Sequence, residues 1–253
     1  MFIGWLTCIP AVLLPHSLCR STTANAPANR QMPIASVVRR HHKKKETDSK
    51  MTKMKDIFSD KELRTGGFYE LAIEVCPSID TKPIKLYTDY IWTLENVSGP
   101  FDDGFNLTQK EFENARNEGI IKLNELTIPF VTLNIREESP IETGSNWFDT
   151  CFYTSAIEKV LGSEYKTWTE KPNVPNELKN FFRTTLEKLY ELYPFRLALI
   201  DFEISGMCYF DDLKKPLTNN LFTNTTFIVG KDCYEQIATD NRECVTIIDE
   251  NYK

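Results

Sequence analysis

Asp201 and Glu203 are the two residues whose type and spacing are best suited to chemistry. They stand near the end of a largely apolar segment, residues 195–204, that is typical of a strand, and side chains two residues apart on a strand project from the same face. A close carboxylate pair can separate its two pKa values for acid–base work, or hold a divalent cation. The structural alternative is an acidic stripe at the end of the strand, paired with Arg196 or nearby lysines. Because no third ligand can be assigned, we predict no metal site.

Residues 56–253 lack the side chains that several other catalytic mechanisms require. All three histidines, His16, His41 and His42, precede residue 56. Without imidazole the remaining residues cannot build a Ser-His-Asp triad, a Cys-His pair or a His-ligated zinc site. The five cysteines after residue 56 show no Cys-x-x-Cys spacing and are interpreted as buried, reduced thiols. Gly-rich phosphate loops and the G-x-S-x-G elbow are missing as well, so we expect no cofactor and favour a protein that is not an enzyme.

The charge is distributed unevenly along the chain. Residues 1–55 contain ten basic and two acidic residues, which leaves twenty basic and thirty-four acidic residues in 56–253, a net charge of −14 where the whole chain has −6. Such a field repels nucleic-acid phosphates and anionic membranes and favours basic partners. The alternative is that the excess acid only keeps the domain soluble.

Residues 56–253 are also rich in aromatic side chains, and Tyr and Trp often anchor protein interfaces. We therefore predict a non-enzymatic protein that binds a basic protein partner, with a small-ligand or histidine-independent carboxylate enzyme as the alternative. In size, acidity and aromatic content the domain is similar to small bacterial immunity proteins that block basic toxins, a likeness of composition that carries no residue across. The candidate binding residues are Asp102, Asp103, Trp92, Trp147, Trp168, Asp211 and Asp212. Their structural alternatives are a turn before a helix cap, an aromatic core and a charged hairpin end.

Residues 1–55 form a basic leader that we expect to be disordered, cleaved or not translated, in front of a single acidic domain, 56–253. The apolar run Phe2–Leu14, followed by Ala24-Asn-Ala, resembles a secretory signal peptide, whereas the acid-free stretch up to Lys45 resembles an organellar transit peptide. A third interpretation takes Met51 or Met54 as the working start. We expect a cytoplasmic protein, with secretion as the alternative if Met1–Ala26 is a signal peptide.

The elements that must position these residues begin with an alternating strand at Tyr69–Val75, and Ile84–Leu94 repeats the alternation as its antiparallel partner. Thr108–Glu111 has the form of a capping box and predicts a helix up to Leu126. Further strands are expected at Ile128–Ile135, at an edge or starting at Pro129, and at Trp147–Tyr153.

The second half begins with a short helix, Ser155–Leu161, ended by Gly162, and a long helix that Pro175 opens and Pro194 stops. The central strand Phe195–Ile204 follows, with Cys208–Phe210 continuing its hairpin. The remaining elements are strands at Thr225–Val229 and Cys244–Ile248 and a helical turn at Tyr234–Ala238. The predicted fold class is α+β: a mixed, mainly antiparallel sheet of about six to eight strands packed against two main helices.

Overall fold

The computed structural model describes residues 49–124, 126–137, 144–162, 168, 172, 174–217 and 222–248. The signal-peptide and transit-peptide interpretations concern residues outside this described part. Within it, no helix combines the length and the apolar character needed to cross a lipid bilayer.

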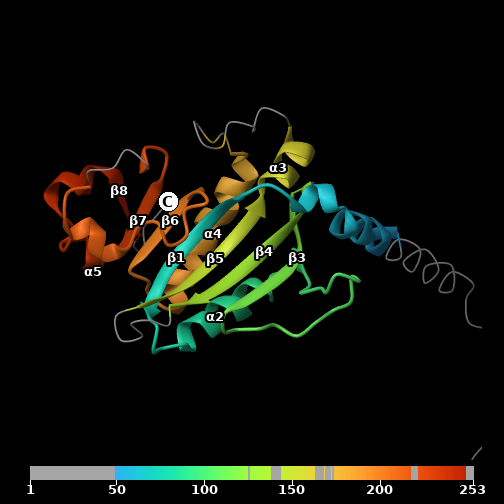
Figure 1. Ribbon diagram of the computed structural model, residues 1–253, viewed down its shortest axis with the longest axis horizontal. Coiled ribbons are helices and arrows are strands. Elements are labelled where there is room, and N and C mark those ends of the chain that lie inside the picture. Colours follow the sequence, from blue (N-terminus) through green and yellow to red (C-terminus); the bar gives the residue numbers. More distant parts are fainter. Residues whose placement is uncertain are drawn as a thin grey trace, which may run out of the picture. The chain divides into compact units, whose positions relative to one another are not determined.

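Eight strands form one mixed sheet, which confirms the predicted α+β class (Figure 1). The strand order is β2–β3–β4–β5–β1–β6–β7–β8, and every neighbouring pair is antiparallel except the parallel pair β7–β8. The strands are β1 (Phe68–Pro77), β2 (Val97–Ser98), β3 (Ala115–Leu123), β4 (Leu126–Arg136), β5 (Ser145–Tyr153), β6 (Leu197–Phe202), β7 (Thr226–Gly230) and β8 (Val245–Ile248). The first strand of the chain therefore lies inside the sheet, between β5 and β6.

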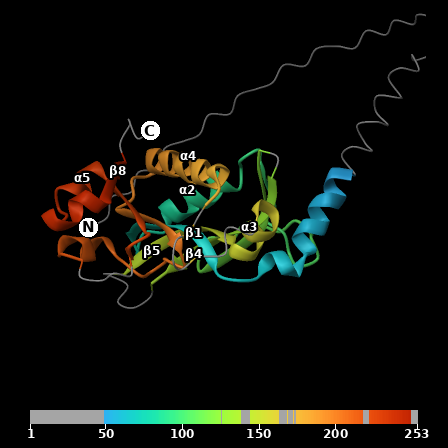
Figure 2. The ribbon, with the colours of Figure 1, turned by 90° about the horizontal axis from the view of Figure 1, so that it is seen from above.

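Two helices, α2 (Lys82–Ile91) and α4 (Asn176–Leu192), cover one face of the sheet (Figure 2). Leu71 and Ile73 of β1 point to this face and belong to the same core cluster as Phe182 and Leu186 of α4. Burial of each such side chain contributes about 1.5–3 kcal/mol relative to exposure. The alternation of β1 thus predicted its helix-covered face correctly.

The opposite face of β1 is covered too, by residues 203–217. Ile204, Phe210 and Leu213 of this segment form a second core cluster with Ala72 and Trp147. The segment contains the 3-10 helix η3 (Phe210–Lys214), while α3 (Thr154–Leu161) and η1 (Lys61–Arg64) cover the neighbouring part of the same face. Because both faces are covered, Glu70, Ala72 and Glu74 of β1 are buried as well.

A helix at residues 49–59 crosses the expected domain boundary at residue 55. Met54, which belongs to the expected leader, is 8% exposed and packs with Phe58, Phe101 and Ile120. The packed part of the chain therefore starts before residue 56.

The prediction of a strand at Ile84–Leu94 is wrong, because α2 occupies most of these residues. Its buried side chains Ile84, Tyr87, Thr88 and Ile91 follow helical spacing, and Pro83 stands in the first turn, where its missing N–H is tolerated. The alternating residues chosen from the sequence included only part of this stripe.

The helix predicted after the capping box is wrong as well, because the region forms β3. Asn117, not a helix cap, bonds the backbone of Glu111: its Oδ1 accepts from the Glu111 N–H at 2.9 Å and its Nδ2 donates to the Glu111 carbonyl at 2.9 Å. Gly119 has a specific role in the strand, since a Cβ there would lie 2.6 Å from the Trp92 ring. This glycine was the signal against a helix.

Two smaller expectations are also corrected. β4 is not an edge strand, since it lies between β3 and β5; Pro129 is tolerated because the β4–β5 register begins only at Val131. Cys208–Phe210 forms no strand and leads into η3. The strands predicted at β5, β6, β7 and β8, and the helices predicted at α3 and α4, are confirmed, and α5 (Lys231–Tyr234) lies beside the expected helical turn.

Candidate functional site

The two carboxylates singled out from the sequence lie in different environments. Asp201 is 7% exposed and both its oxygens accept hydrogen bonds, Oδ1 from the Phe202 N–H at 2.8 Å and Oδ2 from the Thr225 hydroxyl at 2.7 Å. Glu203 is exposed, and its Oε1 accepts from the Phe68 N–H at 3.2 Å. Strand alternation does not pair the two, because β6 ends at Phe202 and Glu203 has a φ of 47°. A joint chemical role for them stays a prediction.

A different acidic cluster, which the sequence did not reveal, lies beneath residues 203–206. Glu70 of β1 and Asp149 and Cys151 of β5 are 3%, 0% and 0% exposed, and one ligand atom from each lies within 4.8 Å of the others. Antiparallel pairing brings them together, since Glu70 lies opposite Cys151 and Ala72 opposite Asp149. We call these three residues the Glu70 cluster.

Ser205 bridges the two carboxyls of the Glu70 cluster. Its N–H donates to Glu70 Oε1 and its hydroxyl to Asp149 Oδ2, both at 2.8 Å. The Cys151 thiol donates to Glu70 Oε2 at 3.3 Å. Asp149 Oδ1 is buried and has no hydrogen-bond partner among the described residues. One oxygen of the four thus lacks the partner that buried polar atoms normally have.

Burial and mutual repulsion disfavour ionisation throughout the Glu70 cluster. Burial raises the pKa of Glu70, although the Ser205 N–H opposes the shift. Burial, followed by the charge of Glu70, raises the pKa of Asp149 well above its ordinary value, and the same two effects in the same order raise the pKa of the Cys151 thiol. Among the described residues, neither carboxyl forms a salt bridge with a Lys or Arg.

Glu74, on the same face of β1, is 1% exposed but has a complete set of partners. Its Oε1 accepts from the Ser145 hydroxyl at 2.9 Å and lies 3.1 Å from Arg196 Nη1, and its Oε2 accepts from the Phe210 N–H at 2.7 Å. Burial raises the pKa of Glu74, while the Phe210 N–H and the Arg196 charge lower it. We therefore interpret Glu74 as a structural carboxylate, because its bond from the Phe210 N–H attaches η3 to β1.

Asp102 and Asp103 lie in the loop 101–107, which is closed by a bridge between Phe101 and Leu107. Asp102 Oδ1 accepts from the N–H groups of Gly104 at 2.9 Å and Asn106 at 2.8 Å, and bonds from Asn106 hold the pKa of Asp102 below its ordinary value. The Asp103 side chain is 99% exposed and lies 3.6 Å from Arg64, whose guanidinium also bonds Glu118. The turn expected here is present, but no helix follows it.

Asp211 and Asp212 stand in the first turn of η3 and have local partners. Asp211 Oδ1 lies 2.7 Å from Lys214 Nζ and 3.0 Å from Arg196 Nη2, and Lys214 is the main cause of its lowered pKa. Asp212 Oδ2 accepts from the Tyr209 N–H at 2.9 Å, which makes a capping box. Both carboxylates stabilise the segment that covers β1.

The expectation that the three tryptophans lie on a binding surface is corrected by their burial. Trp92, Trp147 and Trp168 are 8%, 1% and 6% exposed. Each indole N–H donates to a protein oxygen, on Thr132 at 3.0 Å, Glu137 at 3.2 Å and Glu158 at 2.8 Å respectively. Large aromatic side chains filled the core, as the structural alternative proposed, because they bury the most apolar area.

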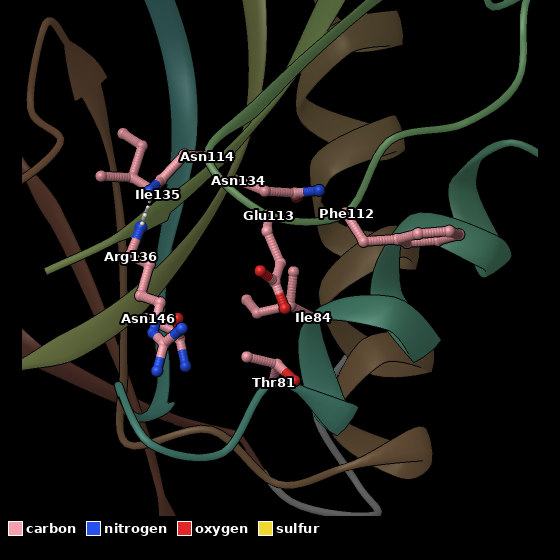
Figure 3. A pocket seen from close by; sticks show the side chains of 9 residues that line it. All are labelled: Thr81, Ile84, Phe112, Glu113, Asn114, Asn134, Ile135, Arg136 and Asn146. Carbon is pink, nitrogen blue, oxygen red and sulfur yellow. Dashed lines mark hydrogen bonds between the residues drawn. The ribbon is translucent and has the colours of Figure 1, made fainter. Parts of the chain in front are cut away.

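Three cavities lie among the described residues that line α2, β4, β5 and the region around Lys122. Figure 3 shows one between α2 and the ends of β4 and β5, where Glu113, Arg136 and Asn146 surround a space of about 10 Å³, room for about one water molecule. Cavities of about 240 and 250 Å³ lie beside Lys122, lined in part by Lys50 and Lys53 and by Asn180 and Thr184 respectively. Small-molecule sites usually enclose about 300–1,000 Å³. None of the three contains a residue of the Glu70 cluster.

The sequence contained a signal for the burial of Asp149 but none for the partners of Asp149 in the Glu70 cluster. Asp149 interrupts the apolar run Trp147–Tyr153, and an acid within a buried strand is rarely left without a function or a partner. Glu70 and Glu74 gave no such signal, because an acid on alternate positions of a strand is expected to face water.

No protein-family model, curated protein or solved structure matches this chain.

Proposed function

We propose that this protein is a non-enzymatic binding protein that recognises a basic protein partner through the loop 101–107. The observation that supports the proposal is a preformed loop that presents carboxylates beside an exposed apolar side chain. Asp103 is 99% exposed and Leu107 is 74% exposed. Because residues 56–253 carry a net charge of −14, such a loop suits a partner with a basic patch around an apolar pocket.

The loop has the rigidity that a binding site requires. The Phe101 and Phe105 rings stack beneath it at 4.3 Å, and Phe58 packs against Phe101 at 5.4 Å. The Phe105 N–H also donates to the Asp102 carbonyl at 2.9 Å. A preorganised loop loses little conformational entropy on binding, so more of the contact energy contributes to affinity.

The three cavities named above are smaller than typical small-molecule sites, and the Glu70 cluster lies outside them. Both observations favour a binding role over catalysis. The alternative that uses Asp201 and Glu203 receives no support from strand geometry, because only Glu203 is exposed.

Calorimetric titration of the full chain with lysozyme, cytochrome c and ribonuclease A, at about 20 mM and about 200 mM salt, tests the proposal with basic proteins of different folds. We expect association with at least one of them that weakens as salt rises. Asp103→Asn should raise the dissociation constant mainly at low salt, and Leu107→Ala should raise it at both salt concentrations. Absence of binding to every probe at low salt contradicts the proposal.

Asp240→Asn is the matched control, because it removes one exposed carboxylate of η5 (Thr239–Cys244) and changes the net charge equally. If Asp103→Asn and Asp240→Asn weaken association to the same extent, the overall field attracts the partner and the loop is not its docking site.

A further inference from the structure

The Glu70 cluster takes no part in the proposed docking loop. Its three ligand atoms converge within 4.8 Å in a buried space, and Asp149 Oδ1, fully buried, has no partner among the described residues. A buried carboxylate oxygen without a partner is unfavourable unless a proton, a water or a cation satisfies it. We propose that Glu70, Asp149 and Cys151 bind one zinc ion.

The donor set selects the metal. Mg²⁺ and Ca²⁺ prefer sites made of oxygen alone, and Cu⁺ prefers sulfur alone. Zn²⁺ accepts thiolate and carboxylate ligands together, commonly with three protein ligands and a fourth position for water or another oxygen. The Ser205 hydroxyl, which donates to Asp149 Oδ2 at 2.8 Å, or a water supplies the fourth oxygen.

The present spacing is close to that of a loaded site. Zinc–oxygen distances of about 2.1 Å and a zinc–sulfur distance of about 2.3 Å place tetrahedral ligands roughly 3.4–3.7 Å apart. The cluster atoms, within 4.8 Å of one another, therefore need to approach by about 1.4 Å at most. Rotation about side-chain bonds of Glu70 supplies such a movement, whereas Asp149 and Cys151 are fixed on a central strand.

Zinc binding releases protons from the Glu70 cluster. The Cys151 S–H, now donated to Glu70 Oε2, loses its proton to solvent when sulfur binds the metal, and any proton held by a carboxyl is released with it. Two carboxylates, one thiolate and Zn²⁺ leave one net negative charge. The guanidinium of Arg116 lies 6.0 Å from the centre of the Tyr153 ring. Its positive charge acts on the Cys151 thiol and lowers the pKa of that thiol.

A metal ion can reach the Glu70 cluster from solvent because the residues that cover the cluster are themselves partly exposed. Ser205 is only partly buried, and Glu203, Gly206 and Met207 are exposed. Gly206 has a φ of 69° and no atom within 4 Å of the position its Cβ would occupy. An ion reaches the cluster when this single turn moves aside.

The test uses the full chain, stripped with a chelator and titrated with Co²⁺ and then Zn²⁺ under absorption spectroscopy and native mass spectrometry. We expect one metal equivalent with a thiolate-to-cobalt charge-transfer band, which Zn²⁺ removes by displacement. Cys151→Ser should abolish the band, and Asp149→Asn should weaken binding by about tenfold or more. Zinc should raise the melting temperature of the wild-type chain but not of Asp149→Asn.

Cys208→Ser is the matched control, because Cys208 is also buried but, among the described residues, its Sγ donates a hydrogen bond to a backbone carbonyl, that of Tyr209 at 3.7 Å, and to no carboxylate. It should keep both the band and the stoichiometry. The histidines and cysteines of residues 1–48 are present in every variant, so differences between variants report the cluster alone.

Two results overturn the proposal. An unchanged band and stoichiometry in Cys151→Ser locate the metal elsewhere, and no binding by the wild-type chain leaves a proton shared by the two carboxyls as the explanation of Asp149 Oδ1. If Cys151→Ser does not fold, Glu70→Gln and Asp149→Asn, which preserve side-chain shape, provide the same comparison.

Discussion

Two carboxylates on one face of β1, Glu70 and Glu74, are both buried but are stabilised in different ways. Glu74 has a hydroxyl, a backbone N–H and the guanidinium of Arg196. Glu70 has a backbone N–H and a thiol, the charge of Glu203 adds to the rise in its pKa, and its own charge raises the pKa of Asp149. The comparison shows that burial alone does not distinguish a structural acid from a candidate ligand; the presence or absence of a counter-charge does.

The largest effect is expected from Arg196→Met, which removes the counter-charge of Glu74. A buried carboxylate left without its cation destabilises a fold by about 3–5 kcal/mol. Arg196 is 33% exposed, so solvent offsets part of this, and we expect about 3 kcal/mol in urea unfolding. Lys188→Met removes one member of an exposed pair with Glu191 and should change stability little. Equal effects of the two variants contradict the structural role of Glu74.

A smaller effect, of opposite sign, is expected from Asp149→Asn in the metal-free chain. This change removes one of two repelling buried charges and keeps an oxygen for the Ser205 hydroxyl. We expect the free energy of unfolding at neutral pH to rise by about 1 kcal/mol. Glu74→Gln, the matched change at the other site, should raise it less, because the charge of Arg196 already opposes the burial cost of ionised Glu74. If the two variants raise the free energy of unfolding equally, the two sites do not differ as proposed.

The sequence correctly predicted the elements whose apolar residues fit only strand spacing or only helix spacing. β1, β5, β6 and α4 were located because their apolar residues follow either strand or helix spacing over the whole element. At α2 most even-numbered positions are apolar, so the sequence pattern favours a strand. At β3 the local motif Thr108–Glu111 favours a helix, and Gly119 is the residue that argues against it.

The Glu70 cluster could not have been predicted, because it depends on which residues cover β1. Ser205, which donates a hydrogen bond to Glu70, is separated from it by 135 positions in the sequence. Residues 203–217 form a second layer on β1, and no local sequence pattern predicts this layer. Without that layer, Glu70 and Glu74 would face water, as their alternation suggested. Asp149 gave a signal of burial but none of its partners, since strand pairing across the sheet is a property of the whole fold.

The smallest effect concerns the dependence of stability on pH at Glu74. Burial raises the pKa of Glu74 above its ordinary value of 4.5 in the folded chain, even though Arg196 opposes the shift and Asp211 adds to it. The folded state therefore holds this proton more tightly than the unfolded state, and its contribution to stability is complete below 4.5 and is lost as pH rises through the raised pKa. In Glu74→Gln this loss cannot occur, so urea unfolding measured from acidic to neutral pH should show a shallower decline than in the wild-type chain. A steeper decline in the variant means that Arg196 lowers the pKa of Glu74 by more than burial raises it, and the Glu74 site then differs from the Glu70 cluster even more than we infer.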